Sequence, residues 1–217
     1  MSNLGKNSPT TRERILMAAC EVFAEKGFRN TTVRDICQKA RVNVAAVNYH
    51  FGSKEKLYEA VCKYACGLSE SNPDPTFALS KDAPAEDKLR DFIQAFLIML
   101  IGQDPSGSMG MLMGREMVEP THALSTVVEE MIRPRFEQLY SIVQSLLGNN
   151  ADDTLIRRCC LSIVGQCLYY RFCRPVISLL NPQQQFDPAS LKELAGHITR
   201  FSLNAMKPFV RKTTEKE

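Results

Sequence analysis

The spacing of hydrophobic residues along the chain predicts helices throughout and no strand. Apolar side chains recur three, four and seven residues apart in each long segment, which is the period of a helix with one buried face. Pro134 should kink its segment or begin a new one, because proline cannot continue a helix interior. The expected helices cover 11–27, 53–68, 84–103, 110–118, 120–147, 152–180 and 188–208.

The stretch after the first helix carries a more specific pattern. Its apolar residues, Ile36 and Val47 among them, predict two short helices joined by a turn. Thr32, Asn43 and Ser53 are good N-cap residues at the points where the periodicity restarts. A short helix pair of this kind is the geometry that places its second helix in the major groove of DNA.

Three segments carry a resemblance to a known family: Ala-Arg-Val-Asn at 40–43, Tyr-His-Phe at 49–51 and Ser-Lys-Glu-Lys-Leu-Tyr at 53–58. Together they closely resemble the DNA-binding region of the TetR family of bacterial transcriptional repressors, and the resemblance covers about residues 10–66. It implies an all-α fold with an N-terminal three-helix helix-turn-helix DNA-binding domain. It also implies a C-terminal helical domain for ligand binding and dimerisation, and a homodimer on double-stranded operator DNA.

The resemblance also places a recognition helix at about 43–50. Asn48 suits an adenine edge, whereas the small side chains before it suit thymine methyl groups. Tyr49, His50, Lys54 and the backbone N–H of Ser53 suit phosphates, although His50 can equally be a buried, capped histidine. The expected DNA-binding residues are Thr32, Arg34, Asn43, Val44, Ala45, Ala46, Asn48, Tyr49, His50, Ser53 and Lys54.

Charge is distributed unevenly along the chain. Residues 1–66 hold 11 Lys and Arg against 6 Asp and Glu, whereas the remaining residues hold 16 against 18. Without the motif this difference could be a chance excess in a small segment. With it, positive charge lies where phosphates must be neutralised, which favours DNA as the partner.

The C-terminal two-thirds contains no glycine-rich phosphate loop and no hydrolase or metalloprotease motif. It is rich in methionine, which suits a flexible cavity for an apolar effector, or alternatively the packing of a core. Arg115 can contact such an effector or form an ion pair with Glu116. The expected effector-binding residues are Phe96, Met99, Met113, Arg115, His122, Tyr169 and Tyr170.

The same region is similar to the C-terminal domain of the CecR-like (YbiH-like) branch of TetR regulators. The similar segments are Gly-Arg-Glu-Met-Val-Glu-Pro-Thr at 114–121, Ile-Arg-Pro at 132–134 and Ser-Ile-Val-Gly-Gln-Cys at 162–167. The last two helices are apolar on more sides than one domain needs, which predicts a four-helix bundle between two subunits. The expected dimerisation residues are Cys160, Ile163, Val164, Cys167, Ile198 and Phe201.

Eight cysteines raise the question of a metal or redox site. No CxxC or nearby histidine completes a tetrahedral ligand set, so we expect neither a metal nor a cofactor. Burial of the thiols in the core is the expected state, with a redox or electrophile sensor as the alternative.

The sequence therefore predicts a dimeric one-component transcriptional regulator, a repressor released by an unknown small-molecule effector. One alternative is a DNA-binding protein whose C-terminal face binds a protein partner; a helical enzyme is disfavoured by the lack of catalytic groups. No apolar run is long enough to cross a bilayer and no signal peptide is evident, so we expect a cytoplasmic protein without a membrane partner. The expected divisions are a disordered tail at 1–9, the DNA-binding domain at 10–56 with its bridging helix at 53–68, an effector-binding and dimerisation domain at 69–210, and a tail at 211–217.

Overall fold

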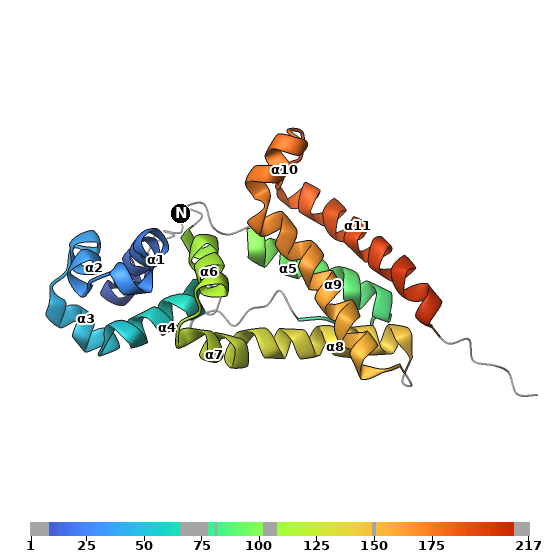
Figure 1. The fold of residues 1–217 in the computed structure, drawn as a ribbon, viewed down its shortest axis with the longest axis horizontal. Helices are drawn as coiled ribbons and strands as arrows, with labels where there is room; N and C mark the ends of the chain where they lie inside the picture. The colour runs from blue at the N-terminus through green and yellow to red at the C-terminus, as the bar shows by residue number, and fades with distance from the viewer. Residues whose placement is uncertain (1–8, 66–77, 81, 102–107, 149–150, 211–217) are drawn as a thin grey trace, which may run out of the picture. The chain divides into compact units, whose positions relative to one another are not determined.

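A computed structural model of the chain describes residues 9–65, 78–80, 82–101, 108–148 and 151–210. Within these ranges the chain forms helices and turns and no strand (Figure 1), which confirms the expected all-α fold. The two expected tails lie outside the described residues, except for Pro9.

The helices divide into two compact units, and the division does not follow the order of the sequence. The first unit contains α1 (Thr11–Asn30), α2 (Val33–Ala40), α3 (Val44–Phe51), α4 (Lys54–Ala65), α6 (Ser108–Val118) and α7 (Ala123–Val127). The second contains α5 (Ala85–Ile101), α8 (Arg133–Leu147), α9 (Asp153–Phe172), α10 (Arg174–Leu180), α11 (Pro188–Met206) and the 3-10 turn η3 (Lys207–Phe209). Thus α6 and α7 pack with the N-terminal helices, whereas the sequence suggested one C-terminal domain from residue 69.

Helix ends in the first unit follow from identifiable local signals. Thr10 and Glu13 form a capping box at the start of α1, and Thr32 forms another with Asp35 at the start of α2. Gly27 interrupts the helical backbone of α1 with φ of 76°, a conformation that glycine adopts without steric cost. The expected cap of α2 at Thr32 is therefore confirmed, and the helical backbone of α1 is interrupted at Gly27, where the sequence predicted its end.

Two prolines set helix boundaries farther along the chain. Pro134 lies in the first turn of α8, after a π-helical turn, η2 (Val128–Ile132), so it begins a new segment. The single helix expected at 152–180 is interrupted at Cys173, and α10 begins with Pro175 in its first turn. The sequence interpretation overlooked Pro175, which has no N–H to donate to the preceding turn.

Each unit has its own apolar core. In the first, α1 lies against α2, α4 and α6, and the ring of Phe23 meets Tyr58 edge-on at 4.8 Å. In the second, α5 lies against α8, α9 and α11 (Figure 1). The second core includes fully buried aliphatic side chains from all four helices, such as Ile93, Leu139, Ile163 and Ile198.

This packing changes the predicted dimer surface. Four of the six expected dimerisation residues, Cys160, Ile163, Cys167 and Ile198, are buried in the core of their own unit, and Val164 is half-buried against it. Only Phe201 is exposed. The helical periodicity of α9 was read correctly, but its buried stripe faces its own unit. The stripe that faces outward instead carries Leu161, Tyr169 and Phe172.

None of the helices in the described part of the chain is both long and apolar enough to span a bilayer. The same residues contain no group of three or more metal-ligating side chains.

Candidate DNA interface

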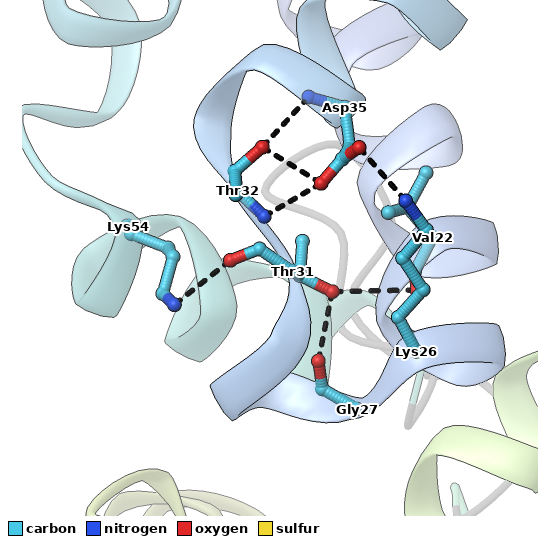
Figure 2. A network of polar contacts seen from close by, with 7 residues as sticks. All are labelled: Val22, Lys26, Gly27, Thr31, Thr32, Asp35 and Lys54. Carbon is cyan, nitrogen blue, oxygen red and sulfur yellow. Dashed lines mark hydrogen bonds and ion pairs between the residues drawn. The ribbon is translucent and has the colours of Figure 1, made fainter.

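The start of α2 is fixed by a network of polar contacts (Figure 2). The Asp35 carboxylate accepts hydrogen bonds from the backbone N–H and hydroxyl of Thr32, at 2.8 and 2.7 Å. Lys26 on α1 donates to the same carboxylate at 2.7 Å. These bonds, that of Lys26 first, hold the pKa of Asp35 well below its usual value, so the carboxylate is charged at neutral pH.

The turn between α1 and α2 is closed by Thr31. Its side chain is buried, and its hydroxyl donates to the carbonyl of Gly27 at 2.7 Å (Figure 2). The unusual backbone at Gly27 is thereby tied to the residue that precedes the α2 cap. Together these bonds set the direction in which α2 leaves α1.

Lys54 was expected to bind phosphate, but its ammonium group is already occupied in the structure. It donates to the carbonyls of Phe28 and Thr31, both at 2.9 Å, and lies 4.5 Å from the centre of the Phe28 ring. A lysine ammonium has three N–H groups, and two of them are used by the carbonyls. Lys54 therefore joins the start of α4 to the turn between α1 and α2.

Arg14 does the same for the other end of α2. Its guanidinium donates to the carbonyls of Ala40 and Arg41, at 2.8 and 3.2 Å. A cation at a helix C-terminus satisfies free carbonyls and interacts favourably with the helix dipole. The helix-turn-helix is thus fixed at both ends of α2 by side chains from α1 and α4.

The recognition helix α3 begins and ends as the sequence predicted. The Asn43 side chain accepts a hydrogen bond from the Ala46 N–H at 2.8 Å, and Gly52 with φ of 79° ends the helix. Val47 and Phe51 point into the core. The exposed residues are Asn43, Val44, Ala45, Asn48 and Tyr49, and Tyr49 is the most open, at 86% exposure.

Two expected DNA contacts on α3 are less accessible. Ala46 is half-buried, as is His50, whose ring lies 5.1 Å from that of Tyr49 and 6.3 Å from that of Phe51. His50 makes aromatic contacts, and no hydrogen bond to its imidazole is found among the described residues. Its ring nitrogens therefore remain available to a phosphate.

Cations of the first unit fall into an occupied set and a free set. The occupied set contains Lys26 and Lys39, which form ion pairs, and Arg14 and Lys54, which donate to carbonyls. Four exposed cations form no side-chain hydrogen bond or ion pair with any residue that the structure describes: Arg29, Arg34, Arg41 and Lys56. The sequence analysis named Arg34 as an expected DNA contact but neither Arg41 nor Lys56. Lys56 lies in the first turn of α4, two residues after Lys54. No signal in the sequence distinguishes the two lysines.

Helix α6 is attached to α1 and α4 by a second polar network. Arg115 donates to the carbonyls of Ala24 and Glu25 on α1, at 2.8 and 3.0 Å. The fully buried Glu116 accepts from the Tyr58 hydroxyl at 2.7 Å and from the Thr121 N–H at 2.8 Å. Burial and this bond raise the pKa of Tyr58, which keeps its proton.

These contacts change the interpretation of the expected effector residues. Arg115 and Glu116 bind different partners instead of each other, and His122 contacts the Phe28 ring at 5.4 Å and lies 3.7 Å from Glu59. Arg115 and His122 thus contact the helices of the first unit, and Met113 lies on the same helix as Arg115. The remaining expected residues, Phe96, Met99, Tyr169 and Tyr170, belong to the second unit.

The described cysteines are free thiols. Five of the seven are buried, and burial raises the pKa of Cys160 and of Cys167 to about 12. Such thiols remain protonated and unreactive at neutral pH, because the thiolate is the nucleophile. Their environment favours the structural role over redox sensing. Cys66 lies outside the described residues.

Comparison with protein families matches both parts of the chain. The model for bacterial regulatory proteins of the tetR family matches residues 15–61. The model described as the C-terminal domain of the HTH-type transcriptional dual regulator CecR matches residues 85–206, more than half of the chain.

Individual relatives agree with the family models. The chain is 28% identical over 196 residues to the HTH-type transcriptional dual regulator CecR of Shigella flexneri, covering 87% of each protein. It is 38% identical to the regulator UidR of Escherichia coli K12 over 61 residues, 28% of this chain and 31% of UidR.

Solved structures show the same fold. The hemolysin II transcriptional regulator HlyIIR superposes with a TM-score of 0.60 at 25% identity, over 93% of this chain and 98% of that one. A tetR-family regulatory protein from Rhodococcus RHA1 has a TM-score of 0.66 at 19% identity, over 94% and 98% of the two chains.

Proposed function

Because the chain belongs to the TetR family of transcriptional regulators and carries the C-terminal domain of the CecR family, we propose that it is a homodimeric repressor released from operator DNA by a small-molecule effector. As a DNA-binding regulator it would act in the bacterial cytoplasm. TetR-type regulators are DNA-binding proteins and not enzymes, so the reading of DNA is the activity to explain. The observation that carries the proposal is the exposed face of α3, together with the free cations on the neighbouring helices α2 and α4.

Base recognition is assigned to α3. Asn48 is exposed and can donate to and accept from an adenine edge, whereas Val44 and Ala45 offer apolar contacts to thymine methyl groups. Phosphate contacts are assigned to the free cations Arg34 and Lys56, and to Tyr49 and His50. Lys54 is assigned a structural role, since its ammonium donates to the carbonyls of Phe28 and Thr31.

A second copy of the chain would cover the outward stripes of α9 and α11. Leu161 and Phe201 are 60% and 59% exposed, and Gly165 lies one turn after Leu161. A side chain added at Gly165 would meet no atom within 4 Å in its own protomer. An apolar stripe with a small residue at its centre allows two helices to approach closely, as in a four-helix bundle between two subunits.

Effector release would operate through α6 and α7. In sequence these helices lie between α5 and α8 of the second unit, yet Arg115 and Glu116 bind them to α1 and α4. A ligand contacting Phe96, Met99 or Tyr170 in the second unit would act on the DNA-binding helices through the chain that continues from α7 through η2 into α8. The ligand weakens operator binding only as far as it binds the arrangement that cannot hold DNA more tightly than the arrangement that can.

The decisive experiment selects duplexes from a randomised library with the full-length protein and measures binding of the selected sequence. We expect one preferred palindromic site bound by two copies, with half-sites about one helical turn apart. Asn48→Ala should cost roughly 1–3 kcal/mol for the preferred base at one position and leave the other positions unchanged. Enrichment of no sequence, or an unaltered preference in Asn48→Ala, would refute the assignment of α3. Placing the site before a reporter gene gives the sign of regulation.

A further inference from the structure

Arg41 occupies a backbone conformation that favours a different residue. Its φ of 55° and ψ of 50° place it in the left-handed helical region, and it is the one non-glycine residue with positive φ in the described part of the chain. Glycine, and to a lesser degree asparagine, adopts this conformation at lower cost than a residue with a long side chain. An arginine here needs a reason beyond the fold, because strained residues of this kind gather at functional sites.

The fold holds this turn without using the Arg41 side chain. The Arg41 N–H donates to carbonyls at the end of α2, and the next N–H, that of Val42, donates to Cys37 at 3.0 Å. From the other side, Arg14 donates to the carbonyls of Ala40 and Arg41. All of these bonds involve the Arg41 backbone or its neighbours. The exposed guanidinium itself has no partner among the described residues.

Arg41 lies in the turn that leads from α2 into the recognition helix α3. Arg41 precedes Asn43, the N-cap of α3, by two residues. A helix N-terminus carries partial positive charge and favours anions. A phosphate bound at that end of α3 would be near the turn that carries Arg41. In helix-turn-helix proteins, the N-terminal end of the recognition helix is the part that enters the groove, with phosphates along its edges.

We propose that Arg41 binds a DNA phosphate at the edge of the groove that α3 enters. This contact explains why an arginine occupies a position whose backbone conformation favours glycine. This inference rests on the proposed DNA-binding function and adds a contact to it. Because a phosphate carries no base identity, Arg41 contributes affinity and register without sequence preference.

The test compares Arg41→Asn, which tolerates the left-handed conformation without charge, with Arg41→Lys, which keeps the charge. Binding to the selected operator and to an unrelated duplex of equal length is titrated between roughly 50 and 200 mM salt. We expect Arg41→Asn to weaken both complexes about 10-fold at the lower salt. The slope of log affinity against log salt should flatten by about 2 for a dimer with one lost contact per subunit. Arg41→Lys should keep most of that slope.

Two controls separate this contact from other effects. Lys192→Gln removes an exposed cation from α11 and should leave the salt slope unchanged, which excludes an effect of net charge. The melting temperature of Arg41→Asn should equal or exceed that of the parent, because the backbone strain is relieved. A lower melting temperature with an unchanged slope would make Arg41 a structural residue.

The outcomes also distinguish this inference from the proposed function. If the unaltered protein binds neither duplex, the proposed function fails. If the unaltered protein binds and Arg41→Asn binds equally well at every salt concentration, the Arg41 contact alone is refuted. A loss confined to the selected operator would assign Arg41 to base recognition and refute the phosphate contact.

Discussion

Both units have an apolar core, but in the first unit charged side chains also donate to the backbone of another element, whereas in the second unit α8 and α9 are joined by a side-chain hydrogen bond from Tyr140 to Asp153. Arg14, Lys54 and Arg115 each donate to carbonyls of a different element. In the second unit the core joins α5, α8, α9 and α11, and ion pairs such as Arg157 with Asp153 remain within one helix. Hydrogen bonds are directional and apolar contacts are not.

This difference suits the tasks proposed for the two units. Surfaces that must match the spacing of bases and phosphates need a fixed geometry, which directional bonds to carbonyls supply. A domain that responds to a ligand must have a second arrangement of similar free energy, and aliphatic packing can be rearranged without leaving buried polar groups unpaired. The comparison therefore predicts different responses to substitution in the two units.

The largest expected effect is in the second core. Ile163→Glu places a charge among aliphatic side chains and should cost roughly 3–5 kcal/mol, which unfolds this unit. Leu161→Glu, two residues earlier on the outward stripe, should leave circular dichroism and melting unchanged for the protomer while sedimentation shows monomers. The sequence had placed Ile163 among the dimerisation residues. A folded monomer from Ile163→Glu, with an intact dimer for Leu161→Glu, would restore that first interpretation.

A somewhat smaller effect is expected for the buried carboxylate of the first unit. Glu116→Leu leaves the Tyr58 hydroxyl and the Thr121 N–H without an acceptor, and each such group costs about 1–3 kcal/mol. Urea unfolding should show a loss of about 2–4 kcal/mol. Tyr58→Phe, which removes one donor and keeps the carboxylate bonded to Thr121, should cost less. Equal stability of Glu116→Leu and the parent would mean that apolar packing, not the polar network, holds α6.

Neighbouring lysines give a third contrast within the first unit. Lys54→Met leaves the carbonyls of Phe28 and Thr31 unpaired and should reduce stability by about 1–3 kcal/mol, with little change in the salt slope of DNA binding. Lys56→Met should do the reverse: unchanged stability, and a slope flatter by about 2 per dimer. If Lys54→Met flattened the salt slope and Lys56→Met reduced stability, the phosphate contact would be assigned to Lys54 instead.

This pair of lysines shows where sequence reasoning ends. Helix periods, caps and the helix-turn-helix were predictable because each depends on residues within a few positions of one another, such as Thr32 with Asp35 or Asn43 with Ala46. Lys54 and Lys56 are alike in sequence, and only the fold shows that Phe28 and Thr31 lie within reach of one of them.

The same limit explains the other differences. The period of α9 showed that it has a buried stripe but not which neighbour covers that stripe, so Ile163 was assigned to the dimer. The partners of Arg115 are about 90 positions earlier in the chain, at Ala24 and Glu25, and no local sequence pattern predicts them. Contacts over such separations depend on how the helices pack, which spacing alone does not determine.

The smallest expected effect is a pH dependence at the start of α2. The pKa of Asp35 in the folded protein lies below its ordinary value of 3.8, because Lys26 and Thr32 donate to the charged carboxylate. A carboxylate with a lowered pKa stabilises the folded state above its unfolded pKa. That contribution is complete at neutral pH and is lost as the pH falls below about 4 through the lower folded pKa. Asp35→Asn should therefore unfold at lower urea than the parent at pH 7, and the difference should shrink steadily as the solution is acidified.

Asp82→Asn removes an exposed carboxylate that forms no ion pair among the described residues, so it should follow the parent at every pH. If Asp35→Asn and the parent differed by the same amount at pH 7 and at about pH 2, the Asp35 charge would not be the source of the effect, and the cap geometry alone would account for it.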